Sequence, residues 1–118
     1  MSVEAAFPIF VFEGNDLSLF DDIHTLTTTL EGVDIEDGMY QAYDSRGRVI
    51  GLEAHGVKRG VFMVEIGTVV VSGISARPSV EEFEERLRSY LKACGADSRR
   101  EMSAEELIHA CINRARSR

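Results

Sequence analysis

Residues 30–48, LEGVDIEDGMYQAYDSRGR, contain five carboxylates and two tyrosines, and the first basic residue of this stretch is Arg46. Ionised carboxylates beside tyrosines combine negative charge with rigid contact area, and surfaces that bind basic proteins use both features. We therefore predict a partner-binding surface in this segment. The residues predicted to contact the partner are Asp34, Glu36, Asp37, Tyr43 and Asp44. The alternative interpretation is an acidic turn and strand whose charges only solvate the surface.

The charge of the chain is unevenly distributed. The net charge is −7, yet residues 1–45 contain ten acidic side chains and no lysine or arginine, while residues 46–118 contain all thirteen basic side chains. Such a segment gives a negative potential to the surface that it forms. This half is therefore not expected to bind nucleic acid, because phosphate groups are bound by cations. A basic protein partner would be attracted to it.

Metal-binding patterns are absent from the sequence. The histidines are His24, His55 and His109, and they lack the short spacings that mark zinc sites. The DIED sequence at 34–37 resembles part of a calcium-binding loop. However, the twelfth position of that loop, which needs a bidentate glutamate, is Ser45. We predict no metal site and no cofactor.

The elements that would position the acidic segment begin with a predicted hairpin. Two short apolar stretches, residues 7–12 and 17–20, flank the turn sequence EGND. Asp21 or Asp22 can then cap the N-terminus of a helix that ends before Gly32.

The middle of the chain predicts further antiparallel strands. Turn-forming residues at Ser45–Gly47 predict a hairpin over residues 38–56, with Tyr40 and Tyr43 on opposite faces. Residues 61–75 are rich in β-branched side chains and predict two strands separated near Gly67.

Two amphipathic helices are predicted at the C-terminal end. The sequences SVEE (79–82) and SAEE (103–106) each have the pattern of a capping box, and each precedes apolar residues at helical spacing. The first of these helices should end at Gly95. The fold class predicted from the whole chain is α+β, an antiparallel β-sheet of about five or six strands with helices packed on one face, in the order ββαββββαα.

The length and composition are those of one folded domain, residues 1–118. No apolar stretch reaches the roughly 18 residues that a membrane span needs, and no secretory signal is visible at the N-terminus. Cys94 and Cys111 occupy apolar positions of the predicted helices, which favours buried free thiols and a cytoplasmic location, although the sequence leaves a disulfide open.

Three parts of the sequence carry a resemblance to a known class of proteins. The stretches FVFEGNDLSLFDDI, LEGVDIEDGMYQAYDSRGRVI and PSVEEFEERLRSYL resemble those of small uncharacterised bacterial cytoplasmic proteins. Some proteins of this kind are encoded beside polymorphic or contact-dependent toxins and act as immunity proteins. The resemblance covers residues 7–92, includes no catalytic motif and assigns no site residues. It implies a non-enzymatic inhibitor of a toxin.

The predicted function is therefore a non-enzymatic acidic protein that masks a basic protein partner, for example a toxin domain. One alternative is an enzyme or small-ligand binder with a pocket between sheet and helices, in which His55 acts with Glu53 or Tyr43. Another alternative is a homodimeric module in which residues 61–71 pair edge to edge.

Overall fold

The computed structural model describes residues 4–60, 64–65, 67–95 and 102–117. The elements, in chain order, are β1 (Ile9–Glu13), β2 (Asp16–Phe20), α1 (Ile23–Thr29), α2 (Gly32–Glu36), β3 (Gln41–Tyr43), β4 (Ile50–His55), β5 (Lys58–Arg59), β6 (Val64–Glu65), β7 (Thr68–Ile74), α3 (Val80–Ala93) and α4 (Ala104–Arg116). The strands pair antiparallel, so the predicted α+β class with an antiparallel sheet is confirmed. The order also agrees, apart from the added short helix α2 and the short strand pair β5–β6.

Strand β1 is the centre of a three-stranded sheet with the order β2-β1-β3. The predicted N-terminal hairpin is confirmed, with Ile9 opposite Phe20 and Glu13 opposite Asp16. Successive side chains of a strand point to opposite faces of the sheet. Because Ile9, Phe10, Val11 and Phe12 are all buried, both faces of β1 must be covered.

Helices α3 and α4 cover one face of this sheet. Phe10 and Phe12 of β1 pack there with Phe83 and Leu87 of α3 and with Leu107 of α4. The predicted capping box at the start of α4 is confirmed, because Ser103 Oγ accepts from the Glu106 N–H at 3.2 Å and Glu106 Oε1 accepts from the Ser103 N–H at 3.3 Å. At the start of α3 the box is not formed, since the side chain of Ser79 makes no capping hydrogen bond.

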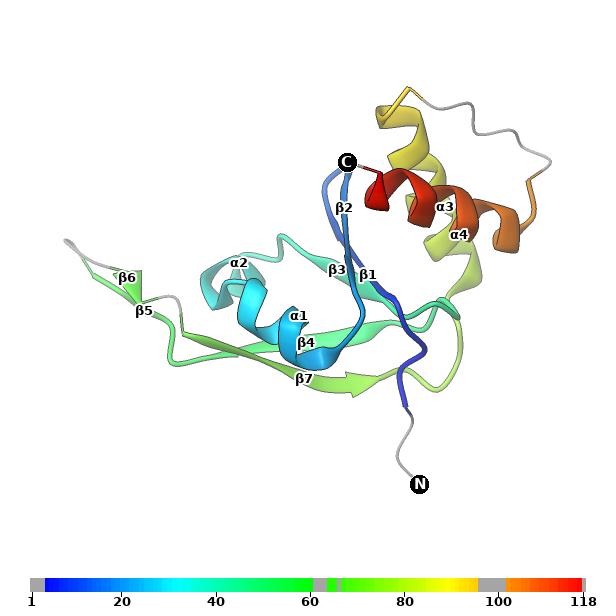
Figure 1. Cartoon of the computed structure of the whole chain (residues 1–118). Coiled ribbons are helices and arrows are strands. Elements are labelled where there is room, and N and C mark those ends of the chain that lie inside the picture. The colour runs from blue at the N-terminus through cyan, green and yellow to red at the C-terminus, as the bar shows by residue number, and fades with distance from the viewer. Residues whose placement is uncertain (1–3, 61–63, 66, 96–101, 118) are drawn as a thin grey trace.

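Helix α1 lies against the opposite face, where Leu26 and Leu30 pack with Ile9 and Val11. The predicted cap of this helix is confirmed, because Asp22 Oδ1 accepts from the Thr25 N–H at 2.7 Å. Helices therefore lie on both faces of the three-stranded sheet rather than on one, as Figure 1 shows for α1 and α2 against α3 and α4. The physical reason is the apolar character of both faces of β1.

The predicted hairpin over residues 38–56 is only partly formed. Strand β3 pairs with β1, strand β4 pairs with β7, and β3 is joined to the β4 region by the bridge between Tyr43 and Val49, the residue before β4. The turn itself exists at the predicted place, with the Gly47 N–H donating to the Asp44 carbonyl at 2.9 Å and Gly47 at φ 80°. The bridge links the three-stranded sheet to the β4–β7 pair, which gives five connected strands.

The sequence predicts two strands in residues 61–75. Strands β6 and β7 are separated at Gly67, which has φ 69°, as the sequence predicts; residues 61–63 and 66 of that prediction lie outside the described residues. Within the described part, no helix combines the length and apolar content that crossing a membrane requires.

Cys111 of α4 belongs to the cluster between the sheet and the helices α3 and α4, and Cys94 packs against this cluster. Each is a free thiol, with Cys111 buried and Cys94 half-buried. Burial raises the pKa of Cys111 to about 12, and the neighbouring Cys94 adds to that shift. The Cys111 thiol is thus un-ionised at neutral pH.

Candidate functional site

Asp44, one of the predicted contact residues, is fully buried. Its Oδ2 atom accepts from Arg48 Nε at 2.7 Å and from the Ala6 N–H at 3.1 Å, and its Oδ1 atom accepts from the N–H groups of Arg46 and Arg48 at 3.0 Å. Burial alone would raise the pKa of this carboxyl, but these hydrogen bonds outweigh burial and lower it. Asp44 therefore holds the turn in place and cannot contact a partner, so its assignment to the partner-binding surface is wrong.

Tyr43 is also buried, with 1% of its surface exposed. Its ring packs edge-on to Phe12 at 5.9 Å between centroids and against Phe83 at 5.2 Å. Its hydroxyl accepts from Arg86 Nε at 2.9 Å. Burial raises the pKa of Tyr43 to about 12. The assignment of Tyr43 to the partner-binding surface is therefore wrong as well, because the residue faces the helices α3 and α4.

The other three predicted contact residues belong to one short segment. Asp34 lies in α2 and is half-buried, Glu36 ends this helix, and Asp37 caps it; Glu36 and Asp37 are exposed. Gly38 has φ 69°, a conformation that glycine adopts without strain, and it turns the chain back toward β3. The turn is held by the Met39 N–H, which donates to the Asp34 carbonyl at 3.0 Å.

Tyr40, rather than Tyr43, lies beside these carboxylates. It was not among the contact residues predicted from the sequence. Its hydroxyl donates to Asp34 Oδ2 at 3.3 Å. Partial burial is the main cause that raises the pKa of Tyr40 to about 12, and the negative charges of Glu13, Asp34 and Glu31 raise it further. The alternation of the strand predicted that Tyr40 and Tyr43 lie on opposite faces. It therefore indicated that only one of the two tyrosines can face α3 and that the other can lie beside the carboxylates.

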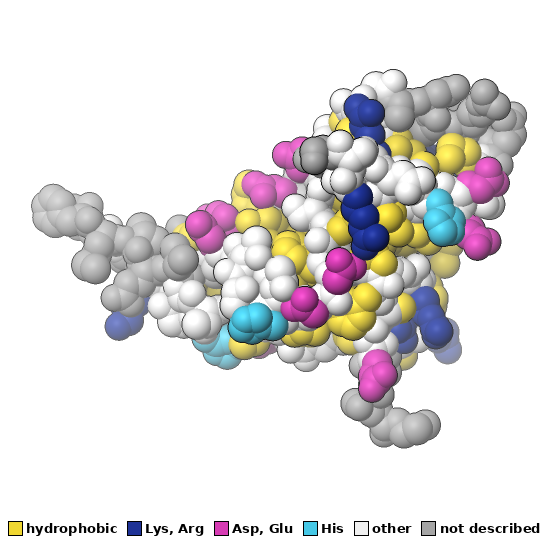
Figure 2. All heavy atoms as spheres, viewed as in Figure 1, with side chains coloured by type: hydrophobic (Ala, Val, Ile, Leu, Met, Phe, Trp, Pro, Cys, Tyr) yellow, Lys and Arg dark blue, Asp and Glu magenta, His cyan; other side chains and the backbone are white. Residues whose placement is uncertain are grey.

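The carboxylates around Tyr40 and in the α2 segment come from two parts of the fold. Glu13 is the last residue of β1, whereas the others belong to α2 and its flanking residues. We call them, with the adjoining Met39 and Tyr40, the acidic surface; its carboxylates are Glu13, Glu31, Asp34, Glu36 and Asp37. Figure 2 shows acidic side chains in a row between α2 and the tip of the β1–β2 hairpin. Among the described residues, no lysine or arginine forms a salt bridge with Glu13, Glu31, Asp34 or Glu36.

Met39 gives the acidic surface an apolar component. It is 46% exposed and directly precedes Tyr40. A flexible thioether side chain adapts to differently shaped partners, and apolar residues surrounded by charges are typical of interfaces.

The remaining acidic residues of the N-terminal half do not join this surface. Asp22 caps α1, and Asp21 Oδ1 accepts from Arg116 Nη2 at 3.0 Å. Asp16 lines a hollow together with Arg114. The arginines of α4 thus lie beside the hairpin acids, so the ten acidic residues of the first 45 do not form one uninterrupted anionic surface.

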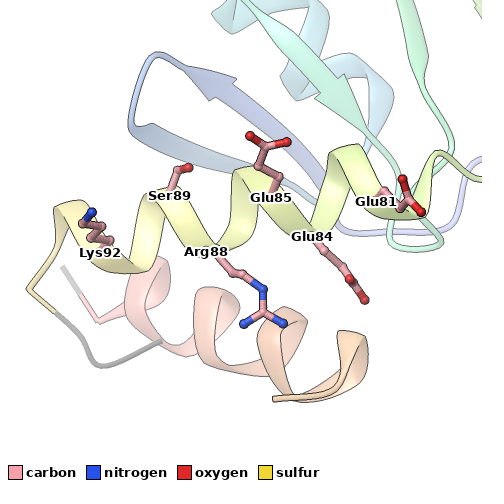
Figure 3. A pocket seen from close by; sticks show the side chains of 6 residues that line it. All are labelled: Glu81, Glu84, Glu85, Arg88, Ser89 and Lys92. Atoms are coloured by element: carbon pink, nitrogen blue, oxygen red, sulfur yellow. The ribbon is translucent and has the colours of Figure 1, made fainter. Parts of the chain in front are cut away.

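The histidine of the enzymatic alternative lies at the surface. His55 Nε2 is 3.5 Å from Glu53 Oε2, and the two side chains are 61% and 60% exposed. A hollow of about 330 Å³ lies instead along α3, lined by Glu81, Glu84, Glu85, Arg88, Ser89 and Lys92. Figure 3 shows Arg88 pointing from α3 toward α4, where its Nη2 donates to the Met102 carbonyl at 3.1 Å. This hollow contains neither His55 nor Tyr43.

Among the described residues, no three histidine, cysteine, aspartate or glutamate side chains are close enough together to hold a metal ion. Comparisons of the chain with models of known protein families, with curated proteins and with solved structures gave no match.

Proposed function

We propose that the protein is a non-enzymatic, cytoplasmic binding protein that masks a basic protein partner through the acidic surface. The observation that carries this proposal is the placement of Asp34 and Glu13 beside Tyr40. Asp34 Oδ2 accepts from the Tyr40 hydroxyl at 3.3 Å. The β1–β3 register, with Phe12 opposite Gln41, brings Glu13 next to Tyr40, and the charge of Glu31 also acts on this phenol. Their charges act together on one phenol although they come from two separate elements.

The physical argument for a basic partner is electrostatic. Glu13, Glu31, Asp34 and Glu36, which form no salt bridge among the described residues, create a negative potential that attracts a positively charged protein and increases its rate of association. Met39 and Tyr40 then supply the apolar and aromatic contact area that keeps the complex together once water is expelled.

The kind of partner is proposed from the resemblance described above. Immunity proteins bind toxin domains, many of which act on nucleic acids and are basic for that reason. A basic toxin domain, encoded beside this protein, is therefore the proposed partner. Masking needs no catalytic group, in keeping with a surface made of carboxylates, a thioether and a phenol.

The test compares two triple variants with equal changes in net charge. One variant neutralises the acidic surface by Glu13→Gln, Glu31→Gln and Asp34→Asn; the control variant carries Glu81→Gln, Glu85→Gln and Glu105→Gln, in α3 and α4. The probe is the purified protein encoded by the neighbouring gene, which the proposal expects to be basic, and its affinity is measured by titration calorimetry.

We expect the first variant to lose affinity by about tenfold or more, which corresponds to about 1.4 kcal/mol, and the control to lose much less. Affinity for the unaltered protein should fall as salt concentration rises. The proposal is wrong if the unaltered protein forms no complex, or if both triple variants bind equally well.

A further inference from the structure

Among the described residues, strand β7 pairs with β4 alone, so no described strand lies along its other edge. Figure 1 shows β7 on the outer side of β4. In an antiparallel pair, alternate residues direct their N–H and C=O groups away from the partner strand. The outer edge of β7 therefore presents backbone groups that can pair with a further strand.

The edge of β7 lacks the charged residues that usually prevent such pairing. Its sequence, TVVVSGI, contains no charged side chain and no proline. The other outer strand, β2, differs: it begins with the exposed Asp16, and α4 packs beside it. A register shift in the β4–β7 pair leaves Ser72 without an opposite residue, so the regular part of β7 is Thr68–Val71.

The side chains on both faces of Thr68–Val71 are suited to a contact between two identical strands. Val69 is buried in the cluster around α1, and Val71 packs at its border, whereas Val70 on the other face is 40% exposed. A two-fold axis through Val70 would place Val70 opposite its own copy and Val69 opposite Val71. Each cross-strand pair is then apolar, and α1 lies on the same face in both copies.

We propose that two copies of the chain associate through β7 and form a continuous sheet with the order β4-β7-β7-β4. The charge pattern favours a second copy as the occupant, because a charged residue on the axis would face its own copy, and β7 has no charged residue at that place or beside it. Two chains that each carry a net charge of −7 can therefore meet at this edge without like charges in the contact. The acidic surface would remain accessible, because α2 packs mainly on β4.

The first experiment measures the oligomeric state by analytical ultracentrifugation, from micromolar to near-millimolar concentration. We expect a monomer–dimer equilibrium whose dissociation constant rises about tenfold or more on Val70→Lys, because two ammonium groups would then face each other across the axis. The matched control is Val80→Lys, since Val80 is 48% exposed and lies at the start of α3. Its dissociation constant should stay unchanged.

The second experiment tests the register and does not depend on the folding of the lysine variant. In a Cys94→Ser background, Val70→Cys should form an intermolecular disulfide under mild oxidation, because opposite residues in an antiparallel pair lie within disulfide reach. Val49→Cys, at a residue that is 37% exposed, is the control and should not cross-link.

Three results would overturn the proposal. They are a monomer at every concentration, a dimer that Val70→Lys leaves intact, and equal cross-linking at positions 70 and 49.

Discussion

Two aspartate–tyrosine combinations from the same segment have opposite roles in this protein. Asp44 and Tyr43 are buried, and each is bound by an arginine, Arg48 and Arg86 respectively. Asp34 and Tyr40, both half-buried, bind each other among other carboxylates. Residue type alone therefore did not decide which aspartate is structural and which lies in the acidic surface. An arginine partner made one aspartate structural, and the lack of a salt bridge among the described residues left the other available for a partner.

The largest predicted effect is on stability, at Asp44. Asp44→Ala removes the buried carboxylate and leaves Arg48 and three backbone N–H groups without their acceptor. Breaking a buried charge pair costs about 3–5 kcal/mol, so the free energy of unfolding should fall by about that amount. Chemical denaturation measures it. Asp34→Ala is the matched control and should cost less than about 1 kcal/mol, since Asp34 is only half-buried and bonds a neutral hydroxyl rather than a guanidinium. Equal losses of stability in the two variants would contradict the structural role of Asp44.

A smaller effect is expected when the two phenols lose their hydroxyl groups. Tyr43→Phe leaves Arg86 Nε without its partly buried acceptor, which should lower the free energy of unfolding by about 1–2 kcal/mol. Tyr40→Phe removes a hydrogen bond between two half-buried side chains, which water can reach, and should cost about 0.5 kcal/mol. The two variants are compared by thermal and denaturant unfolding. A larger cost at Tyr40 than at Tyr43 would contradict the assignment of Tyr43 to the core.

The dependence of stability on pH should report on the buried carboxylate of Asp44. The pKa of Asp44 is lowered from its ordinary value of 3.8 in the folded protein. Its contribution is therefore fully present above the unfolded pKa and is lost as pH falls through the lower folded pKa. Asp44→Asn should flatten the acid side of the stability curve. An unchanged acid limb in Asp44→Asn would argue against this carboxylate as a stabilising group.

The smallest effect is expected in the ionisation of the phenols. The pKa values of Tyr40 and Tyr43 are both raised to about 12, but only Tyr40 owes part of its shift to Glu13, Asp34 and Glu31. Because burial is the main cause, the triple neutral variant of the acidic surface should lower the pKa of Tyr40 only in part and leave that of Tyr43 unchanged. NMR titration of the tyrosine rings measures both values. Equal shifts at the two rings would mean that the carboxylates do not converge on Tyr40.

The strand and helix pattern was largely predictable because its signals are local. Asp22 and Ser103 cap helices as the sequence indicates, and Gly47 and Gly67 mark a turn and a strand break. The arrangement of helices on both faces was not predicted. It depends on β1, whose four buried apolar residues have no free face, and a short apolar run of that kind does not tell which helix covers which side.

The candidate site was less predictable because it depends on contacts distant in sequence. Nothing local to Asp44 reveals that the Ala6 N–H donates to it, although Arg48 at the i+4 position was a visible partner. The choice between Tyr40 and Tyr43 depended on which face of β3 meets α3. Glu13 joins the acidic surface only because β1 and β3 are neighbours in the sheet.

The central claim is that a basic partner binds at the acidic surface, and NMR shift mapping of the backbone amides tests it most directly. On addition of the basic protein encoded by the neighbouring gene, we predict the largest changes at Glu13 and over residues 31–40, with little change around Asp44. Changes centred on α3 or α4, with the amides of residues 31–40 unmoved, would contradict the account.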